Sequence, residues 1–439
     1  MKNSDWVARS IASVWHPCTQ MKHHEHFPLI PVQRGEGVWL YDFGGKRYLD
    51  AVSSWWVNLF GHANARINGA VKAQLDTLEH VMLAGFTHQP VVELSERLAA
   101  LTGLGHAFYA SDGASAAEIA LKMSFHYWRN HGASRKKKFV SLEGGYHGET
   151  LGALSVTDVA LFRDVYAPLT HSHILAPAPH PGGLCNEAGC CPECAHEAAE
   201  ELETLLMERH EEIAAFIVEP LVQGASGMRM YHPGYLKRAR ELCTRHGVHL
   251  IADEIMTGFG RTGTMFACEQ AGILPDFLCL SKGITGGYLP LSCVLTQDDI
   301  YAAFYDDAVT RGFLHSHSYT GNPLACRAAL ASLDIFKHDN IIVANRARAE
   351  RFTALAQPLM AHPAVKNFRH LGMIWAFEVR SGAADFSRRA FAHAIEQGVL
   401  LRPIGNTLYF MPPYVMEDEE FALLVKTAAS IADTLGESA

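Results

Sequence analysis

The chain has 439 residues, of which 49% are hydrophobic and 19% charged, a composition typical of globular proteins and not of disordered or fibrous ones. At about 150 residues per domain, this length predicts two or three domains. The 37 basic and 46 acidic residues leave a formal charge of −9, which argues against nucleic-acid and anionic-membrane partners. No apolar run approaches the roughly 20 residues that span a bilayer, and residues 1–14 lack the apolar core of a signal peptide. We therefore expect no membrane contact and a cytoplasmic location.

The middle of the chain alternates apolar runs of strand length with longer helical patterns. Fully apolar strands are typical of a parallel sheet buried on both faces, and a repeated β–α order is typical of three-layer α/β domains. We therefore predict an α/β large domain built on a mostly parallel, seven-stranded sheet. The candidate strands are Ala107–Ser111, Phe139–Leu142, Leu151–Val156, Ala215–Glu219, His249–Asp253, Phe277–Ser281 and Ser292–Thr296. The helical patterns include Ala116–Asn130, Ala195–His210 and Gly234–His246.

The two ends of the chain follow a different pattern. Residues 28–50 predict a small antiparallel meander, because short strand-like runs are separated by glycine-containing turns. Near the C-terminus, two long helical stretches enclose the strand-like runs Met373–Val379 and Thr407–Met411. We expect both ends to meet in one small α+β domain. The predicted domains are residues 60–330 for the large one and residues 1–59 with 331–439 for the small one.

An aspartate and a lysine stand at the ends of two predicted strands. Asp253 ends the strand His249–Asp253, and Lys282 follows the strand Phe277–Ser281 at a glycine-rich turn. Open α/β sheets bind their ligands at this carboxyl edge. Taken singly, such an aspartate is typical of a helix cap or an ion pair, and a lysine is typical of a solvated charge. Together they match what pyridoxal phosphate needs, a Schiff-base lysine and an acid that keeps the pyridine nitrogen protonated.

Three further segments could contact such a cofactor. The stretch Ser111–Ser115 follows a strand and opens a helix, so its N–H groups could bind an anion, unless a side chain there only caps the helix. Tyr146, in the glycine-rich loop Gly144–Gly148, could stack on a flat ring, or else it is a core aromatic. The hydroxyl-rich stretch His315–Pro323 precedes another helix and could supply a second phosphate contact.

The residues around this aspartate and lysine resemble a family signature. The run Asp253–Gly263, DEIMTGFGRTG, followed by Ser281–Gly283, is similar to the signature of the class III, fold-type I aminotransferases. The resemblance covers nearly the whole chain and is strongest to the members that act on 8-amino-7-oxononanoate in biotin synthesis. It implies a fold-type I architecture, pyridoxal 5′-phosphate as cofactor, and a homodimer with shared active sites. The distinguishing segments are Trp15–Pro17, Ser53–Trp56, Val222–Met228, Arg402–Pro403 and Met411–Tyr414.

The resemblance also implies how the cofactor is held. Lys282 would bind it covalently and act as the catalytic proton shuttle, and Asp253 would pair with its pyridinium nitrogen. Tyr146 would stack on the ring and line the substrate site. The phosphate contacts would come from Gly113 and Ala114 of one subunit and from His317 and Ser318 of its partner.

A substrate site is implied in the same way. Trp56 would wall the pocket, Ser316 would touch the substrate, and Arg402 would bind the substrate carboxylate through its planar guanidinium. From its local sequence alone, Arg402 could equally form a surface salt bridge. Cys18 stands where the family usually has a tyrosine, so the hydroxyl contact made there is missing or supplied elsewhere.

Two other departures leave questions open. Ala114 stands where many relatives have serine or threonine, which leaves only backbone donors for the phosphate. The stretch Ser316–Tyr319 differs from the sequence of many members that use S-adenosylmethionine and is closer to members that use lysine. The amino donor therefore stays open between these two compounds. A class III enzyme specific for an ω-amino acid or a diamine is the nearest alternative.

Two more distant alternatives lie outside the aminotransferases. A nucleotide-binding or hydride-transfer α/β protein is disfavoured, because no Gly-x-Gly-x-x-Gly follows the first strand of the sheet. A non-enzymatic role predicts a colourless protein.

Four of the ten cysteines lie in one short stretch and could bind zinc with His196, or could be free thiols of a surface insertion. We assign no metal. These cysteines are Cys185, Cys190, Cys191 and Cys194.

Overall fold

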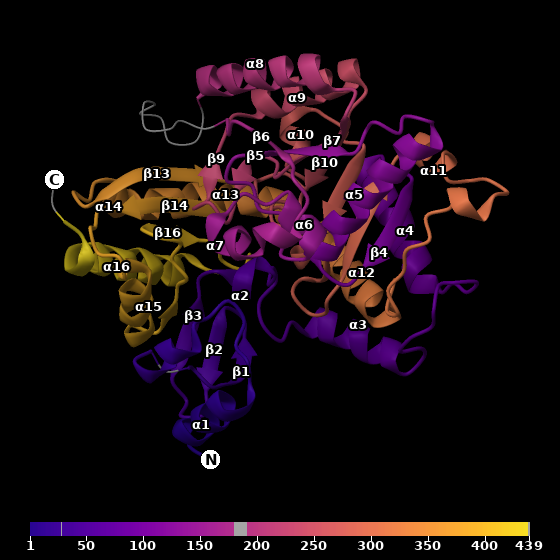
Figure 1. Cartoon of the computed structure of the whole chain (residues 1–439). Coiled ribbons are helices and arrows are strands. Elements are labelled where there is room, and N and C mark those ends of the chain that lie inside the picture. The colour runs from indigo at the N-terminus through magenta and orange to yellow at the C-terminus, as the bar shows by residue number, and fades with distance from the viewer. Residues whose placement is uncertain (28, 180–190, 438–439) are drawn as a thin grey trace. The chain divides into compact units, whose positions relative to one another are not determined.

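The computed structural model describes residues 1–27, 29–179 and 191–437. The chain forms two compact units (Figure 1). The chain crosses between them after residues 65 and 347, where the sequence predicted 59 and 330, and both ends belong to the small unit. The large unit consists of Arg66–Ala347 and Arg369–Ile374, and the small unit of Met1–Ala65, Arg348–Phe368 and Trp375–Ala439.

A seven-stranded sheet forms the centre of the large unit (Figure 1). Its strands are β4 (His106–Ala110), β5 (Lys138–Leu142), β6 (Ile174–Ala176), β7 (Ile213–Val218), β10 (His249–Asp253), β11 (Phe277–Leu280) and β12 (Ser292–Thr296). They lie in the order β4-β12-β11-β10-β7-β5-β6; β12 runs antiparallel to both neighbours, and the other neighbouring pairs are parallel. Every residue of β7 is buried, as expected for a strand covered on both faces. The predicted α/β class with a mostly parallel sheet is confirmed.

One predicted strand is wrong. Residues 151–155 of the predicted run form the helix α6 (Leu151–Ser155), and the seventh strand is instead β6, which has only three residues. A short apolar run fits a buried strand and a buried helix equally well, so its pattern does not decide between them. A side chain distant in the sequence favours the helix, because Glu118 accepts hydrogen bonds from the Gly152 and Ala153 N–H groups of the first turn (2.7 and 3.3 Å).

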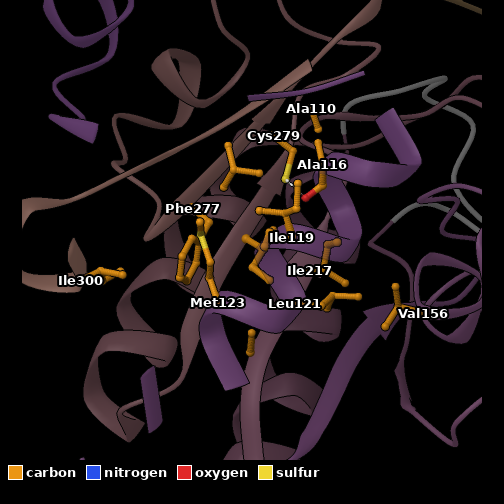
Figure 2. Close-up of a cluster of buried hydrophobic side chains, with 14 residues drawn as sticks. Ala110, Ala116, Ile119, Leu121, Met123, Val156, Ile217, Phe277, Cys279 and Ile300 are labelled. Carbon is orange, nitrogen blue, oxygen red and sulfur yellow. Dashed lines mark hydrogen bonds between the residues drawn. The ribbon is translucent and has the colours of Figure 1, made fainter. Parts of the chain in front are cut away.

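Helix α5 (Gly113–Asn130) carries much of the core of the large unit (Figure 2). Its buried residues, among them Ile119 and Met123, pack with apolar strand residues such as Phe277. Complete burial of side chains of this size contributes roughly 1.5–3 kcal/mol each. Asp112 caps the helix by accepting the Ser115 N–H (2.9 Å), so the capping role considered for this stretch is present. This packing fixes the start of α5 directly after β4.

All three helical patterns predicted from the sequence are helices of the large unit: Ala116–Asn130 lies in α5, and the other two correspond to α8 (Pro192–Arg209) and α9 (Pro233–His246). The remaining helices are α3 (Ala65–Leu75), α4 (Gln89–Thr102), α7 (Ala160–Arg163), α10 (Cys268–Ala271), α11 (Asp298–Ala302) and α12 (Pro323–His338). Shorter elements are the ribbon β8 (Val222–Gln223) with β9 (Arg229–Met230) and the 3-10 helices η2 (Asp164–Leu169), η3 (Lys282–Thr285) and η4 (Val309–Arg311). None of the helices in the described residues is long and apolar enough to cross a bilayer.

The small unit joins the two ends of the chain through a sheet. The meander β1 (Val32–Glu36), β2 (Trp39–Asp42) and β3 (Arg47–Asp50) is antiparallel as predicted, and β15 (Val399–Leu400) pairs with β3 in parallel. A second sheet has the order β13-β14-β16. Its strands are β13 (Val365–Leu371), β14 (Ile374–Val379) and β16 (Thr407–Phe410), of which residues 369–371 and 374 are counted with the large unit. The helices are α1 (Asn3–Ser13), α2 (Ser53–Trp56), α13 (Ile341–Leu355, which begins in the large unit), α14 (Gln357–Met360), α15 (Phe386–Glu396), α16 (Asp418–Leu435) and the 3-10 helix η1 (Met21–Glu25).

Candidate active site

The residues predicted for catalysis follow neighbouring strands of the large sheet. Asp253 is the last residue of β10, Glu219 follows β7 directly, and the loop Gly144–Gly148 begins shortly after β5. Lys282 lies two residues after β11 and begins η3. Because parallel strands end at the same edge of a sheet, these groups face one region of the large unit.

Asp253 pairs with a histidine. His147 Nδ1 lies 2.8 Å from Asp253 Oδ2, and both side chains are buried. A carboxylate can only accept, so His147 donates from Nδ1. The His147 N–H in turn donates to Thr157 Oγ1 (3.0 Å), and the second carboxylate oxygen accepts the Ile255 N–H (3.2 Å). The Asp253 carboxylate is therefore held in one orientation.

Glu219 joins the Tyr146 loop to the end of β7. Its two oxygens accept the N–H groups of Tyr146 (2.9 Å) and Gly224 (3.0 Å). Burial raises the pKa of Glu219 to about 7; the charge of Asp253 adds to this shift, while His147 and the two hydrogen bonds oppose it. Glu219 therefore changes protonation state near neutral pH.

Lys282 lies close enough to these carboxylates to respond to their charge. Burial lowers the pKa of Lys282 to about 8, although Asp253 and Glu219 favour its ammonium form. A lysine with this pKa is partly neutral, and therefore nucleophilic, near pH 8. Its backbone is left-handed (φ 44°), a strained conformation for a non-glycine residue that is common at functional sites.

The start of α5 offers backbone donors in a tight space. The N–H groups of Gly113 and Ala114, in the first turn, make no hydrogen bond within the described residues. A Cβ on Gly113 would lie 3.0 Å from side-chain atoms of Ile255, and a Cβ on Gly148 would lie 2.6 Å from the Ala114 Cβ. Unfilled donors at a helix N-terminus favour an anion, and phosphate is the usual one.

Tyr146 is half-buried, so it is not simply a core aromatic. Its hydroxyl donates to Glu149 Oε1 (2.8 Å), and its ring centroid lies 5.4 Å from that of Phe162. Both contacts lie in the same segment of the large unit as the loop itself. The ring is therefore oriented by its own neighbours.

The predicted residues Ser316, His317 and Ser318 lie on a loop before α12. His317 Nε2 is 3.1 Å from His315 Nε2, and His315 Nδ1 is 2.7 Å from Lys122 Nζ on α5. The two serines are exposed, and their hydroxyls make no hydrogen bond to the part of the chain that the structure describes. Within that part of the single chain, neither serine is hydrogen-bonded to Lys282.

The predicted substrate residues Cys18, Trp56 and Arg402 lie in the small unit. The Arg402 guanidinium lies over the Trp55 ring, 4.3 Å from its centroid, and Arg402 Nη2 is 3.5 Å from the Cys18 carbonyl oxygen. Trp56 is buried and its Nε1–H donates to the Tyr409 hydroxyl (3.1 Å). No described carboxylate lies within ion-pair distance of Arg402, so the salt bridge considered for it does not form within the described chain.

Two groups of this site were missed from the sequence. His147 lies next to Tyr146 in the glycine-rich loop, and that neighbourhood was the only local signal for it. Glu219 directly follows a run of apolar residues, as Asp253 does, so the rule used for Asp253 could also have found it. Their contacts with Asp253 and Tyr146 join residues more than 70 positions apart, which no local pattern reveals.

The cysteine cluster lies only partly within the described residues. Cys185 and Cys190 are outside them. The Cys191 Sγ accepts the Cys194 N–H (3.2 Å) and so caps α8. Among the described residues no group of histidine, cysteine, aspartate or glutamate side chains is arranged to hold a metal ion.

Residues 20–431 match the family model described as aminotransferase class-III, and this chain belongs to that family. It is therefore an aminotransferase, and the alternatives of a nucleotide-binding or hydride-transfer protein and of a non-enzymatic role are wrong. The chain is 48% identical to the adenosylmethionine-8-amino-7-oxononanoate aminotransferase of Helicobacter pylori, over 98% of both chains. It is 43% identical to the enzyme of the same name from Geobacter sulfurreducens, over 96% of this chain and 95% of the relative.

Solved structures agree with this assignment. The adenosylmethionine-8-amino-7-oxononanoate aminotransferase of Methanocaldococcus jannaschii superposes with a TM-score of 0.92 and 34% identity, covering 99% of this chain and 100% of that one. A PLP-bound amine transaminase from an uncultivated Pseudomonas species gives a TM-score of 0.90 and 32% identity, covering 97% of this chain and 99% of that one. The fold-type I architecture predicted from the sequence is confirmed.

Pyridoxal phosphate is the cofactor of this class, and the residues present fit it. The unfilled N–H donors of Gly113 and Ala114 suit its phosphate, and the oriented Asp253 carboxylate suits its pyridinium nitrogen. Lys282 supplies an amine whose pKa is lowered to about 8 by burial, which suits the cofactor aldehyde.

Proposed function

We propose that this enzyme transfers an amino group to 8-amino-7-oxononanoate and forms 7,8-diaminononanoate, a step of biotin synthesis. The observation that carries the proposal is its 48% identity, over 98% of both chains, to a relative named for that reaction. The stacked Arg402 in the small unit adds chemical support, because the proposed acceptor has a carboxylate at one end and a guanidinium binds carboxylates in a bidentate manner.

Lys282 is proposed as the catalytic residue. When bound, pyridoxal phosphate withdraws electrons from the substrate carbon that exchanges its amino group. Lys282 Nζ would take up the proton that this carbon loses and deliver it to C4′ of the cofactor in the same half-reaction, and would carry a proton in the reverse direction in the second half-reaction. The pKa of about 8, lowered by burial, supports this role because the amine must be neutral to accept a proton.

The residues around Lys282 are proposed to hold the cofactor. Asp253, oriented by His147, places its negative charge opposite the pyridine nitrogen, and Tyr146 covers the ring and lines the substrate site. Gly113 and Ala114 donate to the phosphate from the start of α5. The partner subunit would add His317 and Ser318 to the phosphate site and Ser316 to the substrate site.

The small-unit residues are proposed to bind the acceptor. Trp56, fixed by Tyr409, walls the pocket, and Arg402 binds the carboxylate while resting on the Trp55 ring. Cys18 contributes its backbone carbonyl to Arg402 and lacks the hydroxyl of the usual tyrosine.

We also propose that the enzyme is a homodimer and that it works in the cytoplasm. Leu314 and Tyr319, on either side of Ser316–Ser318, are 79% and 64% exposed in the single chain. A second copy of the chain would cover such apolar side chains and place Ser318 of each loop at the other subunit's phosphate site and Ser316 at its substrate site. Mixing Lys282→Ala and Ser318→Ala subunits should give more activity than either variant homodimer has alone if the sites are shared, because one site of each mixed dimer keeps both residues. No gain in activity on mixing would contradict shared sites.

The donor is proposed to be S-adenosylmethionine, since the relatives carry that compound in their names. Purified holoenzyme is mixed with S-adenosylmethionine, and separately with lysine, and the visible absorbance of the bound cofactor is followed. Loss of absorbance at low S-adenosylmethionine concentration is expected. Loss with lysine alone would reassign the donor, and the sequence of Ser316–Tyr319 makes lysine the second candidate.

The acceptor is tested by product formation. With a competent donor, 8-amino-7-oxononanoate should be converted to the diamine, detected by mass spectrometry. Solved amine and omega transaminases share the fold at 27–32% identity, so ω-amino acids and diamines are the matched alternative substrates. Turnover of these compounds without turnover of 8-amino-7-oxononanoate would overturn the proposal.

A further inference from the structure

The turn that carries the tryptophan pair of the small unit is left-handed. Four consecutive non-glycine residues, Ser53 to Trp56, have φ values of 51°, 46°, 74° and 73°. The turn is closed by the bonds Trp56 N–H to Val52 O (2.8 Å) and Val57 N–H to Ser53 O (3.0 Å). Each such residue costs free energy because its Cβ approaches the following carbonyl oxygen. A left-handed turn of this length therefore needs support from its surroundings.

Asp50 provides that support from within the same unit. Its side chain is fully buried, with 0% exposure. Oδ1 accepts the N–H groups of Ser54 (2.9 Å) and Val52 (3.3 Å), and Oδ2 accepts the Ser54 hydroxyl (2.7 Å). The carboxylate thus accepts bonds from Val52, directly before the turn, and from Ser54, its second residue. A buried carboxylate with these partners stabilises the turn over a right-handed alternative that would lose them.

His62 holds Asp50 from the other side. Its Nε2 lies 3.0 Å from Asp50 Oδ2, and its Nδ1 lies 3.0 Å from Asn58 Nδ2. The backbone of His62 is bonded to Gly37 in both directions (2.7 and 3.1 Å). A Cβ on Gly35 would lie 2.6 Å from the His62 Cβ, so the histidine packs directly on the hairpin of β1 and β2. The hairpin therefore fixes His62, and His62 fixes Asp50.

The side chains of the turn contact the C-terminal part of the small unit, including the proposed acceptor residue Arg402. Ser53 Oγ donates to the Met411 carbonyl (2.7 Å), Trp56 donates to Tyr409, and the Trp55 ring lies under Arg402. Trp55 stays 41% exposed, so one part of its indole contacts the arginine and another part faces outward. A change of handedness in the turn would move both indoles away from these partners.

We propose that Asp50 and His62 are positioning residues that hold the left-handed turn, and that they thereby set the affinity for the acceptor. Neither residue touches substrate; each acts through Trp55, Trp56 and Arg402. The link to the acceptor rests on the proposed function, whereas the link to the turn does not. The experiments separate the two.

The first test compares Asp50→Asn with Asp42→Asn in the full-length holoenzyme. Asp42 is a matched control because it is 4% exposed, lies in the same sheet and accepts the N–H groups of Gly44 (2.8 Å) and Lys46 (2.9 Å), away from the tryptophan turn. Asp50→Asn should raise the KM for 8-amino-7-oxononanoate about tenfold with kcat changed less than about threefold. Asp42→Asn should leave KM within about twofold. Equal KM values for the two variants would overturn the proposal.

The second test asks whether glycine rescues the turn. Glycine adopts positive φ without steric cost, so Ser54→Gly in the Asp50→Asn background should restore most of the lost affinity. Persistence of the full KM defect in the double variant would show that Asp50 acts otherwise. If Asp50→Asn does not fold, Ser54→Ala removes only the 2.7 Å hydroxyl bond and should raise KM by about threefold. No rise there would contradict the proposal as well.

A readout independent of activity completes the design. The chain has seven tryptophans, and labelling with 5-fluorotryptophan gives one ¹⁹F resonance for each, with Trp55→Phe and Trp56→Phe as assignments. Asp50→Asn should shift the Trp55 and Trp56 resonances, and Asp42→Asn should leave both in place. Unshifted resonances would overturn the positioning claim. Failure of the wild type to use 8-amino-7-oxononanoate would instead overturn the proposed function, and the spectra would still decide the positioning claim.

Discussion

Two aspartate–histidine pairs with buried carboxylates, one in each unit, use the same chemistry differently. Asp253 Oδ2 lies 2.8 Å from His147 in the large unit, and Asp50 Oδ2 lies 3.0 Å from His62 in the small unit. Asp253 accepts one further hydrogen bond, from a backbone N–H, whereas Asp50 accepts three from the adjacent turn. The Asp253 carboxylate therefore keeps capacity for another group, while that of Asp50 is committed to the turn.

The local sequence does not distinguish the two pairs. Asp253 is the last residue of β10 and Asp50 is the last residue of β3. The chain segment after each strand decides the use of the carboxylate. After β10 the next strand end delivers Lys282, while after β3 the chain turns left-handed within three residues. A buried carboxylate that accepts few hydrogen bonds from its own segment can thus bind another group, whereas one that accepts several holds that segment in place.

The largest effect is expected at Lys282, which follows β11, the strand that pairs with the strand of Asp253. Lys282→Ala removes the proposed proton shuttle and should lower kcat by about 10³-fold or more. The far-UV circular dichroism should remain that of the wild type. Methylamine added as an external base should recover a small part of the activity. Turnover within tenfold of the wild type would contradict the role of Lys282.

The two aspartates should differ in the kinetic constant that they change. Asp253→Asn removes the charge proposed to lie opposite the pyridine nitrogen and should lower kcat by about 10²-fold or more, with little effect on acceptor KM. Asp50→Asn should act mainly on KM, because Asp50 only positions the acceptor residues. Steady-state kinetics of both variants with the same acceptor checks this. The comparison between the pairs fails if both variants lower kcat equally.

Glu219 should make the stability of the large unit depend on pH. Burial raises the pKa of Glu219 from 4.5 to about 7, so its contribution to the free energy of unfolding is fully present below pH 4.5 and is lost as the pH rises through 7. The loss should reach up to about 3 kcal/mol. Urea unfolding at pH 5 and pH 8 should show a smaller difference for Glu219→Gln than for the wild type.

Glu254 is a second buried glutamate with a raised pKa, so Glu254→Gln provides a comparison for Glu219→Gln in this measurement. Burial also raises the pKa of Glu254 to about 7, and its carboxylate accepts the N–H groups of Ala267 (2.7 Å) and Cys268 (2.8 Å), not that of Tyr146. Glu254→Gln should reduce the pH dependence by a similar amount. An unchanged pH dependence in the Glu219 variant would show that this group is already ionised in the folded protein.

A smaller effect is expected at Arg402. Arg402→Lys keeps the charge but loses the planar fork and much of the contact over the Trp55 ring, 4.3 Å away. The acceptor KM should rise about tenfold while kcat changes little. An acceptor analogue without the carboxylate should bind both forms equally. A KM equal to that of the wild type would remove Arg402 from the carboxylate site.

The smallest effect is expected at Cys18. Its contact with Arg402 is made by the backbone carbonyl, 3.5 Å from Nη2, and not by the thiol. Cys18→Ala should therefore change the acceptor KM by less than about twofold. Cys18→Tyr, which restores the residue usual in the family, provides the comparison. A large loss with alanine would show that the thiol itself contacts the substrate.

Much of the large unit could be predicted because its signals are local. Strands β10 and β12 have the predicted bounds, and the predicted carboxyl-edge residues Asp253 and Lys282 lie where the strand pattern placed them. The run Leu151–Val156 could not be assigned correctly, because Glu118 on a distant helix caps it as a helix. Strand β6 has only three residues, too few for a pattern.

The site was less predictable where it depends on distant contacts. His147 is 106 residues from Asp253, and their pairing follows from the order of the strands in the sheet. The left-handed turn Ser53–Trp56 contains no glycine, so the usual sequence signal for positive φ is absent. Its cause, the carboxylate of Asp50 held by His62, appears only when the hairpin is assembled.

The most direct test of the central claim is a single assay of amino transfer. Purified holoenzyme is incubated with S-adenosylmethionine and 8-amino-7-oxononanoate, with lysine as a second donor, and 7,8-diaminononanoate is quantified by mass spectrometry. We expect the diamine to form with the wild type and to fall below detection with Lys282→Ala. A wild-type enzyme that exchanges amino groups with other amines but makes no diamine from 8-amino-7-oxononanoate would contradict the account.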